Sequence, residues 1–162
     1  MITIVTGEVD SGKTTALLAI YQMLRGSAEG FAILKEYRDG QFIGQKVMDL
    51  LSGNTAPFSY LEDHLPSGLE KHTQYGRFIL LDEGLSAADE SIRKARLHRA
   101  QNIFADEFGP LELRGKGLWP TYRRLLNNLD LQKTNLYMAV RNSCVASCIH
   151  QLGLPCREVV II

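Results

Sequence analysis

The sequence GEVDSGKT at residues 7–14 matches the pattern G-x-x-x-x-G-K-[ST] at every specified position. This pattern requires a sharp turn between a strand and a helix, where its glycines let successive backbone N–H groups point inward. The flanking residues meet that requirement. Residues 2–6 are β-branched and almost wholly apolar, as in a strand buried on both faces, and residues 14–24 carry apolar side chains at helical spacing. The unit indicates an α/β fold with a phosphate-binding loop.

The loop offers several groups that suit a polyphosphate. Lys13 can reach the β- and γ-phosphates, and the hydroxyl of Thr14 can ligate Mg²⁺. The helix after the loop adds the positive end of its dipole at the same place. We therefore expect the nucleotide to be held by Gly7, Glu8, Val9, Asp10, Ser11, Gly12, Lys13, Thr14 and Thr15, with Lys13 also acting in catalysis.

Strand and helix patterns alternate along the rest of the chain. Candidate strands are residues 30–37, 77–83, 102–109, 135–140 and 157–162, and candidate helices are residues 85–100, 121–130 and 143–152. The alternation predicts a three-layer α/β P-loop domain, spanning residues 1–162, with a mostly parallel central sheet. Asp39-Gly40 predicts a β-hairpin extension, because both residues tolerate positive φ. Residues 52–76 are rich in Gly and Pro and are expected to form irregular loop.

Composition narrows the class of protein further. Lys and Arg number 18, as do Asp and Glu, so net charge gives no reason to expect binding to nucleic acid or to an anionic membrane. The three cysteines are few and odd in number, which suits a reducing compartment. Neither a run of about 18 apolar residues nor a secretory leader pattern is present. We expect a cytoplasmic protein without membrane or nucleic-acid partners, and the sequence indicates no particular protein partner.

Two carboxylate pairs could supply a metal ligand opposite the phosphate loop. Asp82-Glu83 comes after the apolar run FILL, and Asp106-Glu107 comes after NIFA. The first pair precedes a predicted helix, where acidic residues are common because of the helix dipole. The second pair precedes the polar segment FGPLELRGKG, at a strand end where ligands bind in open α/β sheets. The pattern therefore favours Asp106 over Asp82 as the metal ligand.

Three segments together carry a family resemblance. ITIVTGEVDSGKTT, ADEFGPLEL and the later GLWP resemble the Thep-type nucleoside-triphosphatase family, and residues 39–53 are similar to its glycine-containing strand pair. The resemblance implies that Gly7, Gly12, Lys13 and Thr14 bind phosphate and metal. It further implies that Asp106 is the metal carboxylate and that Glu107 activates water. Residues 54–80 match no family motif, so no base-recognition residue is carried over.

Three polar groups remain as candidates: the first is Arg93, Arg96 and Arg99, the second is Arg114 and Lys116, and the third is Arg141 and Asn142. The other candidates are the set Cys144, Cys148, Cys156 and His150, and the single residue Trp119. A solvated helix face explains the first group better than an arginine finger does. The second and third groups lie near the expected phosphates, so phosphate contact or γ-phosphate sensing stays open for them. The Cys and His spacing matches no strong zinc pattern, so buried packing is expected. Packing is also the simplest role for Trp119, and adenine stacking is the open alternative.

The expected function is Mg²⁺-dependent hydrolysis of nucleoside triphosphates to diphosphate and phosphate. A small nucleotide or metabolite kinase is the alternative from the same chemistry, with an acceptor hydroxyl in the place of water. A nucleotide-gated binding module with slow hydrolysis is the alternative from another class. No [NT]-K-x-D sequence occurs, so guanine specificity has little support.

Overall fold

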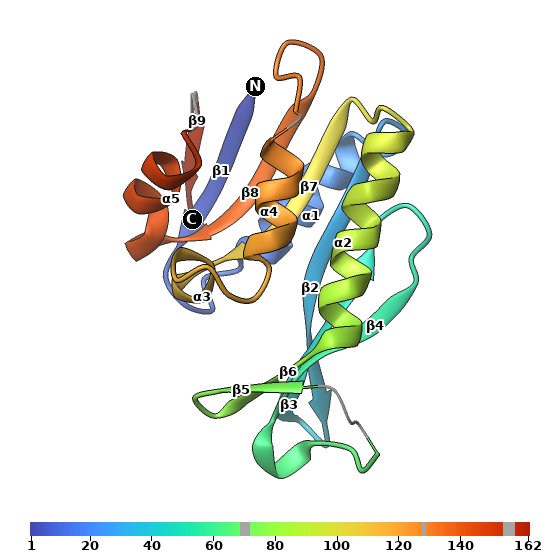
Figure 1. The fold of residues 1–162 in the computed structure, drawn as a ribbon, viewed down its shortest axis with the longest axis vertical. Helices are drawn as coiled ribbons and strands as arrows, with labels where there is room; N and C mark the ends of the chain where they lie inside the picture. The colour runs from blue at the N-terminus through green and yellow to red at the C-terminus, as the bar shows by residue number, and fades with distance from the viewer. Residues whose placement is uncertain (69–71, 128, 154–157) are drawn as a thin grey trace.

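A single mixed sheet with helices on both faces forms the protein in a computed structural model that describes residues 1–68, 72–127, 129–153 and 158–162 (Figure 1). The strands are β1 (Ile2–Gly7), β2 (Ala28–Arg38), β3 (Gln41–Asp49), β4 (Thr55–Leu61), β5 (His72–Tyr75), β6 (Phe78–Leu81), β7 (Asn102–Phe108), β8 (Asn135–Arg141) and β9 (Glu158–Ile161). The helices are α1 (Lys13–Met23), α2 (Asp82–Leu97), α3 (Pro110–Leu113), α4 (Trp119–Leu126) and α5 (Val145–Leu152), with short 3₁₀ helices η1 (Glu62–His64) and η2 (Asn142–Cys144). The α/β prediction is confirmed.

The sheet has a parallel half and an antiparallel half. Within the described ranges the strand order is β5-β6-β4-β3-β2-β7-β8-β1-β9. The four pairings from β2 to β9 are parallel, and the four from β5 to β2 are antiparallel. The prediction of a mostly parallel sheet is therefore wrong, because strands β3 to β6 extend the sheet by hairpin-type connections that need no helical crossover.

The antiparallel half contains one confirmed and one wrong prediction. Asp39 and Gly40, with φ of 50° and 77°, join β2 to β3 in the expected hairpin. Residues 52–76, expected to be irregular, instead include β4, η1 and β5. Pro57 fits inside β4 because a register shift at this point places one extra residue, Phe58, between two successive pairs. A bulge is one of the few positions where a strand tolerates proline.

Alternating side chains of the central strands build a core on each face of the sheet. Ile2 and Ile4 of β1 pack in the larger cluster with residues of α2, α4 and α5, whereas Val5 packs in a second cluster with Leu17 of α1. Figure 1 shows α2 and α4 in front of the sheet and α1 behind it. None of the helices in the described residues is long and apolar enough to cross a membrane.

Two helix boundaries differ from the prediction in ways that matter for the site. α2 begins at Asp82, so strand β6 ends at Leu81 and not at residue 83. Asp82 and Glu83 then lie in the first helical turn, as the dipole explanation of this pair requires. The expected loop 110–120 contains α3, whose first residue is Pro110, a favourable residue at this position.

Candidate functional site

The phosphate loop lies at the carboxyl end of β1, in the position that its pattern predicts. Two of its residues, Asp10 and Gly12, have left-handed backbones with φ of 64° and 93°, which turn the chain sharply into α1. Lys35 of β2 forms an ion pair with Asp10 at 2.5 Å, and this contact lowers the pKa of the Asp10 carboxyl. The loop is therefore tied to the neighbouring half of the sheet.

Lys13 bends back over the loop that precedes it. Its Nζ donates hydrogen bonds to the carbonyl oxygens of Gly7, at 3.1 Å, and Glu8, at 2.5 Å. The side chain of Glu8 in turn accepts a hydrogen bond from Asn142 Nδ2 at 3.2 Å. The first residue after β8 thus contacts the loop directly, as expected if it lies near the phosphates.

Asp106, near the end of β7, is the carboxylate that meets the phosphate loop. Its Oδ2 accepts hydrogen bonds from the Thr14 hydroxyl at 2.8 Å and from the Ile33 N–H at 2.9 Å. Its Oδ1 accepts the N–H of Glu107 at 2.8 Å. The Asp106 side chain is fully buried. Burial, and to a lesser extent the nearby charge of Glu107, raises the pKa of the Asp106 carboxyl to about 7, although the three hydrogen-bond donors act to lower it.

A bulge in β7 orients the two carboxylates differently. Between Ala105 and Phe108, β7 has one residue more than its partner β8. Glu107 takes up this extra length with a left-handed backbone of φ 64°, which turns its side chain out of the strand's normal alternation. The buried Tyr122 of α4 donates its hydroxyl to the carbonyl oxygen of Asp106 at 2.9 Å. A packed helix thereby supports the backbone at the bulge.

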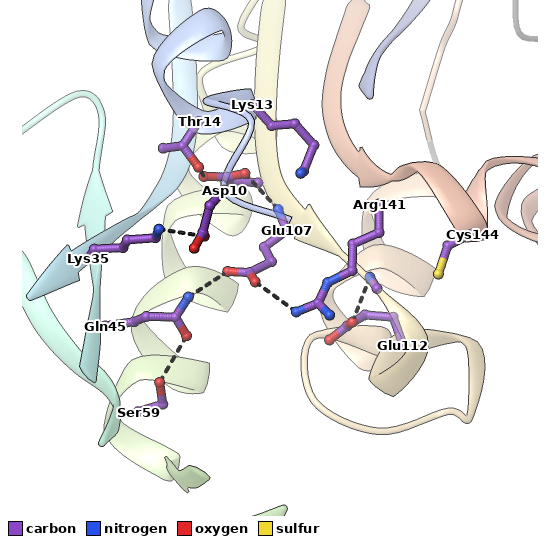
Figure 2. A network of polar contacts seen from close by, with 12 residues as sticks. Asp10, Lys13, Thr14, Lys35, Gln45, Ser59, Glu107, Glu112, Arg141 and Cys144 are labelled. Atoms are coloured by element: carbon purple, nitrogen blue, oxygen red, sulfur yellow. Dashed lines mark hydrogen bonds and ion pairs between the residues drawn. The ribbon is translucent and has the colours of Figure 1, made fainter. Parts of the chain in front are cut away.

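Glu107 is held between the two halves of the sheet. Its Oε2 accepts a hydrogen bond from Gln45 Nε2 of β3 at 2.9 Å, and its Oε1 lies 3.5 Å from Arg141 Nη2 at the end of β8 (Figure 2). The buried hydroxyl of Ser59 donates to Gln45 Oε1 at 2.9 Å and so sets which way the amide faces. These contacts fix the carboxylate beside Asp106 while leaving its side chain 31% exposed.

Glu112 organises the segment after the bulge. Its carboxylate accepts the N–H groups of Gly109, at 2.9 Å, and Leu118, at 3.0 Å, and so closes α3 and the following loop into one unit. The side chain is buried, and burial raises its pKa to about 7 in spite of these two donors. The motif DEFGPLEL thus contains one structural carboxylate, Glu112, besides the pair at its start.

The structure separates the two carboxylate pairs that the sequence offered. It brings Asp106 to the Thr14 hydroxyl, whereas Asp82 is exposed at the start of α2 on the antiparallel side. The preference for Asp106 therefore agrees with the geometry. The metal role of Thr14 and Asp106 and the catalytic role of Glu107 stay predictions.

The weaker candidates divide in the same way. Arg93 pairs with Glu90 on the surface of α2, and its side chain is 59% exposed, as a solvated helix face predicts. Arg114 donates to the Tyr75 hydroxyl at 2.9 Å, which attaches α3 to β5 and not to the phosphate loop. Arg141 belongs to the network around Glu107. Trp119 packs edge-on against Phe108, with ring centroids 6.5 Å apart, so its packing role is confirmed.

The cysteines behave as the packing hypothesis expects where they are described. Cys144 and Cys148 are buried in the core beside α5. Cys156 lies outside the described residues. No group of three or more metal-ligating side chains was found among the residues that the structure describes.

Sequence reasoning missed Gln45, Ser59 and Tyr122. Gln45 nevertheless carried a signal, because it lies between Ile43 and Val47 on the buried face of an alternating strand. A polar residue at a core-facing position needs a hydrogen-bond partner, and here that partner is Glu107. Ser59 and Tyr122 had no comparable signal.

Two curated proteins are similar to the chain in sequence. The nucleoside-triphosphatase THEP1 of Archaeoglobus fulgidus is 32% identical over 114 residues, which cover 69% of this chain and 62% of that protein. The nucleoside-triphosphatase THEP1 of Thermofilum pendens is 27% identical over 128 residues, or 77% of this chain and 67% of that protein. The chain thus spans less than two thirds of the first relative.

Two solved structures share the fold. The crystal structure of THEP1 from the hyperthermophile Aquifex aeolicus matches with a TM-score of 0.70 and 23% identity, covering 100% of this chain and 88% of that one. The solution structure of a human cancer-related nucleoside triphosphatase matches with a TM-score of 0.69 and 21% identity, covering 99% and 86%.

The family model described as NTPase matches residues 2–153, which include the phosphate loop, the β7 bulge and Arg141. This match extends over nearly the whole chain. The chain therefore belongs to the NTPase family.

Proposed function

We propose that this protein hydrolyses nucleoside triphosphates, ATP among them, to nucleoside diphosphate and phosphate, with Mg²⁺ as its cofactor. The observation that carries the proposal is the meeting of the phosphate loop with the β7 bulge. Thr14 Oγ1 lies 2.8 Å from Asp106 Oδ2, and Glu107 is the next residue. The proposal gives phosphate binding, metal binding and water activation to side chains that lie close together at this point.

The donor set at this point suits a magnesium ion. Thr14 and Asp106 offer hydroxyl and carboxylate oxygens, which are the ligands that Mg²⁺ prefers. The hydrogen-bond donors around Asp106 are neutral groups, and burial raises its pKa to about 7, so a nearby cation would supply the missing opposite charge. When bound, the ion would draw charge away from the phosphate oxygens.

The chain's own residues have distinct tasks in this proposal. Backbone N–H groups of the loop and the Lys13 ammonium bind the β- and γ-phosphates, in exchange for the carbonyl contacts that Lys13 makes here. The Glu107 carboxylate accepts the proton of the attacking water, as a general base. Gln45 and Arg141 hold that carboxylate in place. Arg141 also lies close enough to the site to stabilise negative charge on the γ-phosphate.

The names of the relatives agree with this activity, since both sequence relatives are called nucleoside-triphosphatases. Family membership supports the same reaction class. The side chains that carry the proposal, from the phosphate loop to Arg141, all lie within the residues that the family model matches.

The test compares wild type with Glu107→Gln in an assay of phosphate released from ATP, with and without Mg²⁺. Gln keeps the size of Glu but cannot accept the proton, so we expect kcat to fall by about 10²–10⁴-fold with little change in ATP affinity. The bound nucleotide should remain triphosphate when examined by chromatography. Asp82→Asn, at the exposed carboxylate of α2, is the matched control and should hydrolyse normally. Wild-type phosphate release by Glu107→Gln, or release that ignores Mg²⁺, would refute the proposal.

A further inference from the structure

A cavity of about 360 Å³ lies beside Glu107, between the antiparallel half of the sheet and the start of α3. Most of its wall is aromatic or aliphatic and comprises Phe58, Tyr75, Phe78, Leu80, Pro110 and Leu111. Gln45, Glu107 and Arg141, which also line it, are linked to one another as Figure 2 shows. The cavity therefore has apolar walls and one polar end, and that polar end is the predicted base.

Hydrolysis alone does not explain a cavity of this size. A single water needs roughly 10–15 Å³ of such space. Small-molecule sites occupy roughly 300–1,000 Å³ and combine apolar walls with a few polar groups, as this cavity does. Its volume lies near the lower end of that range. A compact molecule of about nucleoside size fits this space better than a peptide or an oligosaccharide.

The cavity faces the end of the triphosphate and not its nucleoside. The phosphate loop comes directly after β1, and the sheet order places β8 and β7 between β1 and the antiparallel half. Because Thr14 points to Asp106, a triphosphate on the loop runs from β1 toward β7 and ends near Glu107. The walls formed by β3, β4 and β6 lie beyond that end. A molecule bound in this cavity would thus be a second substrate, placed to meet the γ-phosphate.

We propose that this cavity binds a second substrate, an aromatic alcohol of about nucleoside size, and that the site transfers the terminal phosphoryl group to its hydroxyl. The proposal rests on the proposed function, whose water it replaces by an acceptor. Phe58, Tyr75 and Phe78 offer ring faces and edges to a flat ring, and Glu107 offers the hydroxyl an acceptor. The guanidinium of Arg77, whose Cζ lies 5.3 Å from the centroid of the Phe78 ring, adds N–H donors to the wall of the cavity.

The transfer step balances without any further reagent. The acceptor hydroxyl oxygen forms a bond to the γ-phosphorus as the bond from that phosphorus to the β,γ-bridging oxygen breaks. The hydroxyl proton passes to the Glu107 carboxylate, and the electron pair of the broken bond leaves with the nucleoside diphosphate. The products are the phosphorylated alcohol and nucleoside diphosphate.

The experiment offers the full chain ATP labelled at the γ-phosphate together with one of four probes, adenosine, guanosine, cytidine or thymidine. Product chromatography then separates labelled nucleoside monophosphate from labelled inorganic phosphate. We expect labelled monophosphate from at least one probe. Leu111→Trp, which fills the cavity, should lower the ratio of phosphate transferred to phosphate released by about tenfold or more, the effect of roughly 1.4 kcal/mol.

Two further variants secure the result. Leu97→Trp makes the same change at a side chain that is 69% exposed at the far end of α2 and should leave the ratio unaltered. Arg77→Trp, at an exposed wall position, should also lower the ratio. This variant provides the test if Leu111→Trp does not fold. Phosphate release without transfer to any probe overturns the acceptor proposal and leaves the hydrolase intact. Transfer that survives both cavity variants overturns the assignment to this cavity. If the protein gives neither phosphate release nor phosphate transfer, the proposed function itself is refuted.

Discussion

Gln45 is the residue through which the antiparallel half of the sheet contacts the predicted base, so Gln45→Leu isolates that contact. The substitution keeps the approximate size of the side chain and removes the 2.9 Å hydrogen bond to Glu107 Oε2. A hydrogen bond to a charged group is worth about 1.5–3 kcal/mol. Glu107 is partly exposed and keeps its contact with Arg141, so the loss should lie at the lower end of this range. A loss of about 1.4 kcal/mol in the transition state corresponds to about a tenfold lower rate. We expect kcat to fall roughly tenfold with ATP affinity nearly unchanged.

The same change leaves the buried Ser59 hydroxyl without its acceptor, which costs about 1–3 kcal/mol of folding free energy. The double variant Gln45→Leu/Ser59→Ala removes both partners and should regain most of that stability while keeping the kinetic defect. Phosphate release and thermal unfolding, measured on the same samples, separate the two effects. Gln74→Leu, on the exposed strand β5, is the matched control. If the double variant also regains wild-type kcat, Gln45 contributes only stability and the positioning argument is wrong.

Three other substitutions test the site. Lys13→Ala should abolish triphosphate turnover in an otherwise folded protein, because several kcal/mol of charge stabilisation are lost; turnover near the wild-type rate would place the active site elsewhere. Asp106→Asn should weaken Mg²⁺ dependence far more than Asp82→Asn in parallel titrations, and the reverse order would contradict the assignment. Glu112→Gln tests a buried acid whose pKa is raised to about 7. The folded protein keeps Glu112 protonated up to about pH 7, whereas the unfolded chain ionises it near pH 4.5, so wild type loses stability as pH rises between these values. The melting temperature of Glu112→Gln minus that of wild type should therefore increase from pH 5 to pH 8. An unchanged difference would refute this reasoning.

The parallel half of the fold was predictable because its signals are local. The phosphate-loop pattern requires a strand before it and a helix after it, and β1 and α1 lie within one residue of the expected bounds. At the start of the antiparallel half, Asp39 and Gly40 also form the predicted turn, again because the signal is local. Asp82 and Asp106 were distinguished by the residues on the C-terminal side of each, and the structure brings only Asp106 to Thr14.

Beyond the hairpin between β2 and β3, the antiparallel half was not predictable from such signals. Pro57 and the nearby glycines indicate loop when read one residue at a time, yet β4 accommodates Pro57 through a bulge that depends on its pairing with β3. The orientation of Glu107 depends in the same way on a register difference between β7 and β8. Pairing partners lie far apart in the chain, so the contact between Gln45 and Glu107 appears only when the strands are assembled.

The oxygen Asp106 Oδ2 belongs to two structural units at once. The ladder between β2 and β7 ends at Phe31 and Ala105, and beyond it the carboxylate takes the place of a backbone carbonyl in holding the Ile33 N–H. The same oxygen accepts the Thr14 hydroxyl of the phosphate loop. Any ligand that draws this carboxylate toward the loop must lengthen its bond to β2. We therefore expect the hydrogen–deuterium exchange rate and the proton chemical shift of the Ile33 amide to report occupancy of a site to which Ile33 contributes no side chain.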